Sequence, residues 1–145
     1  MLQVIRAGRV IDGTGAAPIE RATIIVEDGR IREGGQAGQV REPQGSDVEQ
    51  VDCSDYTVLP GLIDCHVHLV FSAEGSALQD ILTEKNRRIL LRAVHNAQLA
   101  LRTGVTTVRD CGGRAGVTFE LRNAIEAGIL PGPRIFAAGP AITTT

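Results

Sequence analysis

The chain has 145 residues, of which 43% are hydrophobic and 22% charged, as in soluble globular proteins. Seventeen acidic against fifteen basic residues give a formal net charge of −2, so composition provides no electrostatic case for a nucleic-acid or membrane partner. Three cysteines, odd in number and without Cys-x-x-Cys spacing, argue against a disulfide framework. Because no signal peptide or run of ~20 apolar residues occurs, we expect a cytoplasmic protein.

Residues 1–59 are predicted to form a small β domain. The dipeptide Asp28-Gly29 lies between β-rich runs and predicts a hairpin, because type I′ turns need positive φ. Residues 34–50 are rich in Gly, Gln and Pro and are expected to form a loop. Strand character returns at 56–59, and Pro60-Gly61 then marks a change of direction, where we place the domain boundary.

Residues 60–145 alternate between strand and helix patterns. A helical apolar period is followed by Gly104, a natural residue to end a helix, and His95 within it is expected to be structural or solvent-facing. The elements expected after the first strand are a helix at 78–103, a strand at 105–108, a helix at 118–127 and a strand at 134–138. This order predicts right-handed βαβ units on a parallel sheet, either a barrel or a doubly wound sheet.

The most informative segment is Pro-Gly-Leu-Ile-Asp-Cys-His-Val-His-Leu at 60–69. Strand alternation places His66 and His68 on one face, where two imidazoles can reach one divalent metal. Asp64 has the same parity and is expected to orient an imidazole, or to contact substrate. Cys65 is expected to face away as a small buried hydrophobe.

Two other readings of the His-x-His pair stay open. Histidines on an exposed strand are often only polar surface, but the apolar flanks predict a strand buried on both faces, where unpartnered imidazoles are costly. A cupin-type metal strand needs a Glu a few residues after the second His, and Glu74 comes later than that.

Residues 60–68 resemble the first-strand signature of the amidohydrolase superfamily of metal-dependent hydrolases. Three further segments resemble the same superfamily in the expected order: Val-Ile-Asp-Gly-Thr-Gly at 10–15, Gly-Val-Thr-Thr-Val-Arg-Asp-Cys-Gly-Gly at 104–113, and Gly-Pro-Arg-Ile at 132–135. Together they are most similar to the branch that holds imidazolonepropionase-like proteins and Xaa-Pro dipeptidases (prolidases).

The resemblance implies an α/β fold, the start of a (β/α)8 TIM-type barrel preceded by an N-terminal β-sandwich segment. Residues 1–59 would belong to the sandwich, and residues 60–145 would form two β/α units and a third strand. Because a complete barrel takes roughly 250 residues, we expect an incomplete barrel and an N-terminal portion of a hydrolase.

The resemblance also implies hydrolysis of an amide or cyclic amide C–N bond in a small molecule or dipeptide, by water activated on one or two divalent metals, with Zn²⁺ as the expected ion. His66 and His68 would be metal ligands. Arg109 and Asp110, at the end of the second strand, would contact substrate or pair as buried charges. In similar proteins the bridging ligand (a carboxylated lysine or a Glu), two more histidines and the general acid/base aspartate come from later strands. Lys85 lies in a predicted helix and does not match the bridging lysine.

Two ligands are too few for a catalytic zinc site, so we expect residues 1–145 alone to be inactive. The alternative function is a non-catalytic fragment, or a split subunit completed by a separate chain. Since an unclosed barrel leaves a strand edge unpaired, we expect association with a second copy or with such a complementary chain.

Overall fold

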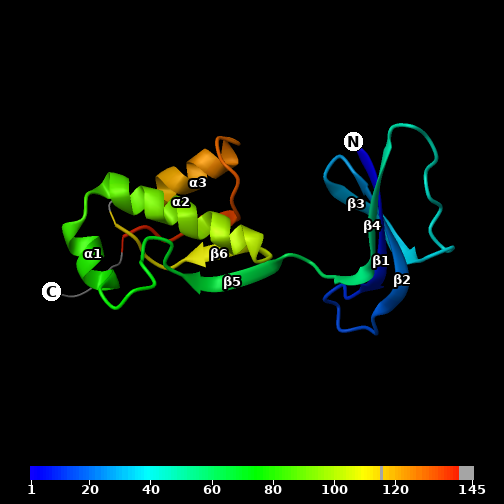
Figure 1. Cartoon of the computed structure of the whole chain (residues 1–145), viewed down its shortest axis with the longest axis horizontal. Helices are drawn as coiled ribbons and strands as arrows, with labels where there is room; N and C mark the ends of the chain where they lie inside the picture. Colours follow the sequence, from blue (N-terminus) through cyan, green and yellow to red (C-terminus); the bar gives the residue numbers. More distant parts are fainter. Residues whose placement is uncertain (115, 141–145) are drawn as a thin grey trace. The chain divides into compact units, whose positions relative to one another are not determined.

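The computed structural model describes residues 1–114 and 116–140. The chain divides after Pro60 into two compact units, which are described separately below (Figure 1). The boundary expected from the sequence lies one residue earlier, between residues 59 and 60.

The first unit is a four-stranded sheet with the strand order β3-β2-β1-β4. Its strands are β1 (Leu2–Val10), β2 (Ile19–Glu27), β3 (Arg30–Gln36) and β4 (Val48–Val58). Strand β1 pairs antiparallel with β2 and parallel with β4, and β2 pairs antiparallel with β3. The described residues of this unit form this one sheet, so a second layer of the predicted sandwich does not come from them.

The predicted hairpin joins β2 to β3. Asp28 and Gly29 have φ values of 49° and 75°, the two positive φ angles of a type I′ turn. The loop expected at 34–50 is shorter in the structure, because β3 continues to Gln36 and β4 already begins at Val48. The glycines at the end of β3 extend the strand because they pair with the central residues of β2.

The second unit is a three-stranded parallel sheet, in the order β5-β6-β7, with helices along one face (Figure 1). The strands are β5 (Leu62–Val67), β6 (Val105–Asp110) and β7 (Arg134–Ala137), and the main helices are α2 (Asn86–Arg102) and α3 (Val117–Glu126). The core between sheet and helices contains Leu69, Val70, Ile89, Ala93, Ala97, Val108, Val117, Leu121 and Ile135. The parallel α/β arrangement predicted from the sequence is confirmed.

The helix predicted at 78–103 is two helices, which corrects the sequence interpretation. Helix α1 (Ala77–Thr83) ends at Glu84, and both Glu84 and Lys85 have extended backbone. Leu82 is 65% exposed and α1 has no fully buried residue, although Ile81 packs partly against the core, whereas α2 buries Ile89 and two alanines. Among the described helices, none combines the length and apolar character needed to cross a membrane.

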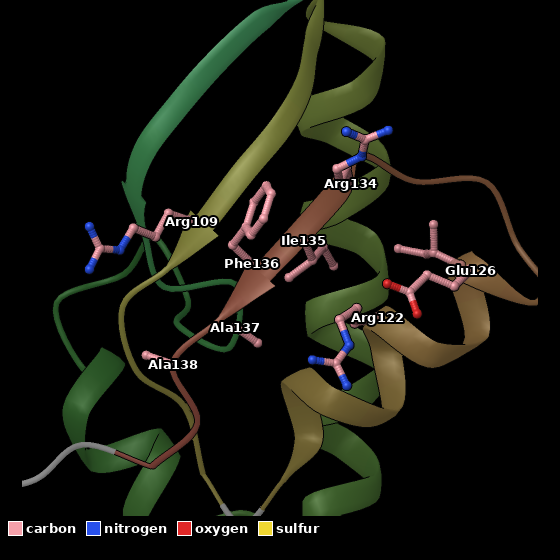
Figure 2. Close-up of a pocket in the computed structure, with 9 residues that line it drawn as sticks. Arg109, Arg122, Glu126, Arg134, Ile135, Phe136, Ala137 and Ala138 are labelled. Atoms are coloured by element: carbon pink, nitrogen blue, oxygen red, sulfur yellow. The ribbon is translucent and has the colours of Figure 1, made fainter.

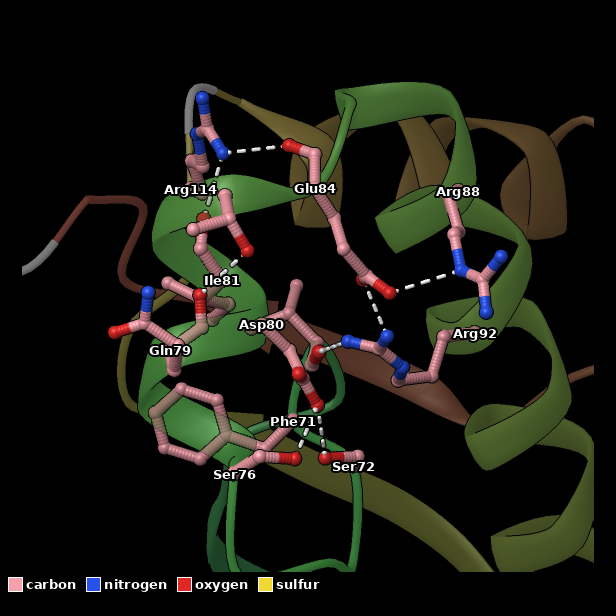
Figure 3. Close-up of polar contacts among 12 residues, drawn as sticks. Phe71, Ser72, Ser76, Gln79, Asp80, Ile81, Glu84, Arg88, Arg92 and Arg114 are labelled. Carbon is pink, nitrogen blue, oxygen red and sulfur yellow. Dashed lines mark hydrogen bonds and ion pairs between the residues drawn. The ribbon is translucent and has the colours of Figure 1, made fainter.

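Side chains from two other segments stabilise this break (Figure 3). The Glu84 carboxylate pairs with Arg88 at 2.8 Å and with Arg92, both on α2. Arg114, after β6, donates from one guanidinium nitrogen to the carbonyl oxygens of Ile81 at 2.6 Å and Glu84 at 2.8 Å. These carbonyls lie at the end of α1, where they lack helical partners, so Arg114 caps the helix.

Strand β5 was expected to be buried on both faces, but most of it is exposed. Leu62 is 55% and Ile63 67% exposed, and Cys65 is exposed as well. The reason is that β5 pairs only with β6 in the described sheet, and that helices cover one face. On the other face, Phe136 of β7 is 58% exposed.

Candidate functional site

The two histidines of the motif lie together at the C-terminal end of β5. Their ring centroids are 5.3 Å apart, with the rings edge to face. His66 is exposed, whereas His68 is half-buried and stacks on Phe71, with a centroid distance of 4.7 Å and an interplanar angle of 23°. The rings are therefore close enough to approach a common ion.

A bulge in β5 determines which side chains share a face. Asp64 pairs with Val108 and Val67 pairs with Asp110, so three steps along β5 match two along β6. Because Val108 and Asp110 point toward the helices, their partners Asp64 and Val67 lie on the helix side of the sheet, although Asp64 itself is exposed. The extra residue removes the parity argument that placed Asp64 beside the imidazoles, so the role expected for Asp64 stays a prediction.

The Asp64 carboxylate also has a different hydrogen-bond partner from the one expected. Its Oδ1 accepts a hydrogen bond from the backbone N–H of His66 at 3.0 Å. Asp64 lines a hollow between β5 and α2 together with Leu99 and Thr103. Its contact with the motif is therefore through the backbone.

His68 is held by the loop that follows β6. Its Nδ1 lies 2.9 Å from the carbonyl oxygen of Gly112. A carbonyl only accepts hydrogen bonds, so this contact assigns the proton to Nδ1 and leaves the Nε2 lone pair free. A histidine whose second nitrogen donates to a carbonyl is typical of metal ligands.

Asp110, at the end of β6, is fully buried and binds the backbone next to His68. Its carboxylate accepts hydrogen bonds from the backbone N–H groups of Leu69 at 2.9 Å and Gly112 at 3.3 Å. Burial raises the pKa of this carboxyl above its ordinary value, although both backbone hydrogen bonds and the nearby His68 act in the opposite direction. Asp110 thus contacts the residue directly after His68 and also Gly112, whose carbonyl oxygen contacts the His68 ring.

Arg109 and Asp110 do not form the buried charge pair that was one expectation. Successive strand residues point to opposite faces, and Arg109 is exposed while Asp110 is buried. Arg109 lines a groove around β7 with Arg122, Arg134 and Phe136 (Figure 2). In that view the Arg109 guanidinium points away from the α3 side chains.

Sequence reasoning missed two polar residues of α2 that bind the segment after His68. Asn96 donates to the carbonyl oxygens of Leu69 and Phe71, and Arg92 donates to that of Val70 at 3.2 Å. The available signal was their spacing of four residues, which places both on one side of the helix.

The described residues bring two imidazoles together, those of His66 and His68. Neutral imidazole nitrogen suits zinc and related ions, and the free Nε2 of His68 fits that role. Within residues 1–114 and 116–140, no group of three or more His, Cys, Asp or Glu side chains is placed to hold a metal ion. The pair therefore fits one side of a metal site.

Comparison with known proteins assigns the chain to a class. Residues 57–145 match the amidohydrolase family, so the chain belongs to this family, and the family predicted from the sequence motifs is confirmed.

Among curated relatives, the chain is 38% identical over 69 residues to an imidazolonepropionase of Agrobacterium fabrum (strain C58 / ATCC 33970), a match that covers 48% of this chain and 16% of the relative. Among solved structures, it resembles a Xaa-Pro dipeptidase with bound methionine, with a TM-score of 0.86 and 32% identity over 98% of this chain and 34% of that one. A prolidase complexed with N-methylphosphonate-L-proline gives a TM-score of 0.81 and 31% identity over 97% of this chain and 32% of that one. The chain thus spans about a third of the solved structures it matches.

Proposed function

We propose that this chain carries the first pair of metal ligands, His66 and His68, of a metal-dependent amidohydrolase. The reaction is hydrolysis of an amide or cyclic amide C–N bond in a small molecule, and dipeptides of the Xaa-Pro type are the first substrates to test. Support comes from the family match and from similarity to an imidazolonepropionase and to prolidases. A cytoplasmic location is proposed from the three free cysteines.

The observation that carries the proposal is the contact between His68 Nδ1 and the Gly112 carbonyl. It fixes the ring and leaves Nε2 available beside the His66 ring. A divalent metal, with zinc as the first candidate, would supply a water of lowered pKa and polarise the substrate carbonyl. The chain's own part is to present two oriented imidazoles at the C-terminal ends of parallel strands, where barrel enzymes bind substrate.

Zinc titration of the purified chain by calorimetry tests the ligand assignment. We expect weak binding, because the described residues supply two ligands, and we expect the His66→Ala, His68→Ala double variant to lose it. His95→Ala is the matched control, since His95 is an exposed histidine on α2. Zinc binding that survives in the double variant would refute the assignment.

The second candidate is a non-catalytic portion or split subunit that needs further polypeptide to close its barrel. The observation in its favour is that β5 and β7 are both edge strands of the described sheet, with Ile63 and Phe136 exposed. We expect residues 1–145 alone to show no metal-dependent turnover of Xaa-Pro dipeptides, N-acyl amino acids or small lactams. Robust turnover by the purified chain would contradict this candidate.

A further inference from the structure

Asn96 of α2 uses both hydrogens of its side-chain amide on the segment after His68. Its Nδ2 donates to the carbonyl oxygen of Leu69 at 2.8 Å and to that of Phe71 at 2.9 Å. Both partners only accept hydrogen bonds, so the amide nitrogen, and not the amide oxygen, must face them. Asn96 is half-buried, and in this position its orientation is fixed by its partners.

The segment bound by Asn96 has two further hydrogen bonds, one to β6 and one within the segment itself. The N–H of Leu69 donates to Asp110 at 2.9 Å, and the N–H of Phe71 donates to the carbonyl oxygen of His68 at 3.1 Å. Leu69 is 4% exposed, so its backbone groups have little access to water and depend on these partners. The backbone that leaves His68 is therefore fixed between α2 and β6.

This segment determines the surroundings of the His68 ring. The Phe71 ring stacks on one face of the imidazole, and the Gly112 carbonyl receives its Nδ1–H. A shift of the Phe71 backbone would move the stacked ring and release the imidazole from the carbonyl. In the described part of the chain, Asn96 forms no hydrogen bond with His68; it acts through the backbone that it binds.

We propose that Asn96 is a positioning residue that keeps His68 in its Nδ1–H tautomer, with Nε2 free. The value of a free Nε2 rests on the proposed function, because Nε2 is the proposed metal-binding atom. The tautomer itself is a property of the metal-free chain, so it can be measured whether or not the chain binds zinc.

Long-range ¹H–¹⁵N correlation spectra of the labelled, metal-free chain, at a pH where imidazoles are neutral, distinguish the two tautomers. We expect His68 to be mainly Nδ1–H in the unmodified chain. Asn96→Leu removes both hydrogen-bond donors at similar side-chain volume. Asn96→Asp replaces the amide by a carboxylate, which cannot donate to the two carbonyl oxygens. In both variants we expect His68 to become a mixture of tautomers while His95 keeps its signals.

Asn86→Asp is the matched control, because Asn86 is the exposed first residue of the same helix and is expected to leave the His68 signals unchanged. A folded Asn96→Leu chain in which His68 keeps its original tautomer would overturn the proposal. If the variants do not fold, hydrogen exchange of the Asn96 side-chain amide in the unmodified chain tests the proposal instead. We expect slow exchange for Asn96 relative to Asn86, and equal rates would also overturn the proposal.

Zinc affinity separates this proposal from the one on which it rests. A change in a residue that orients a ligand typically lowers metal affinity by roughly 10–100-fold. We expect a loss of that size in Asn96→Leu, measured by the same titration as above. A chain that binds no zinc at all would refute the proposed function, while the tautomer measurement would still decide the role of Asn96.

Discussion

The Asp110 carboxylate accepts a hydrogen bond from the backbone N–H of Leu69 at 2.9 Å, which ties the end of β6 to the residue directly after His68. The same carboxylate accepts from Gly112, whose carbonyl oxygen contacts the His68 ring. One fully buried side chain thus connects both backbone segments that surround this histidine.

Asp110→Asn is expected to destabilise the second unit. The carboxylate has two acceptor oxygens for two amides, whereas an asparagine has one, so one buried N–H loses its partner. An unsatisfied buried group costs about 1–3 kcal/mol, which denaturant titration can measure. Arg109→Gln, on the exposed face of the same strand, should leave the free energy of unfolding nearly unchanged. An Asp110→Asn chain as stable as the unmodified one would contradict this account.

Glu84→Gln is expected to loosen α1 without unfolding α2. The Glu84 carboxylate is largely buried between two arginines, and a neutral amide cannot accept from both with the same strength. Hydrogen exchange of the amides in Ala77–Thr83 should accelerate by roughly tenfold or more. Glu126→Gln, at an exposed position that ends α3, is the control. Unchanged exchange in α1 would show that the ion pairs do not hold the helix.

Glu42 should stabilise the first unit near neutral pH, and this contribution to the free energy of unfolding should be lost in acid. The hydrogen bond from Arg6, at 2.5 Å, lowers the pKa of Glu42 below its ordinary value of 4.5, with a smaller contribution from Thr23. A lowered folded-state pKa adds stability above 4.5, and this stability is lost as the pH falls through the folded-state value. The difference in unfolding free energy between the unmodified chain and Glu42→Gln should therefore be largest near neutral pH and shrink in acid. Glu33→Gln, at an exposed position on β3, serves as control, and a difference that grows in acid would have the wrong sign.

Cys65 should behave as a surface thiol, which reverses the expectation from the sequence. Because the residue is exposed in the bulge of β5, Cys65→Ala should change the free energy of unfolding by less than about 0.5 kcal/mol. Iodoacetamide should label Cys65 in the folded chain faster than the half-buried Cys111, as mass spectrometry of the peptides can show. Labelling of Cys65 only after denaturation would mean that the strand is covered in solution.

The features that sequence predicted correctly depend on neighbouring residues. The hairpin follows from the positive φ of Asp28 and Gly29, and the end of α2 follows from Gly104, whose φ is 91°. The parallel sheet follows from the alternation of helical and strand periods.

The features that sequence missed depend on residues far along the chain. The break after α1 is stabilised by Arg114, and the hydrogen bonds of Asn96 and Asp110 exist only once α2 and β6 pack beside β5. The bulge is likewise a property of the β5–β6 pairing, so no period within β5 reveals it. The closeness of His66 and His68 was predictable, whereas the carbonyl that orients His68 was not.

The extra residue of β5 has a consequence for how this protein tolerates changes in length. The strand pairs with β6 on both sides of the extra residue: Asp64 pairs with Val108, and Val67 pairs with Asp110. Removing Cys65 would leave both pairings possible and would turn neither flank of the strand over. In a regular strand, deleting one residue turns every following side chain to the other face. At Cys65, by contrast, a deletion is compatible with His66 and His68 on the same face.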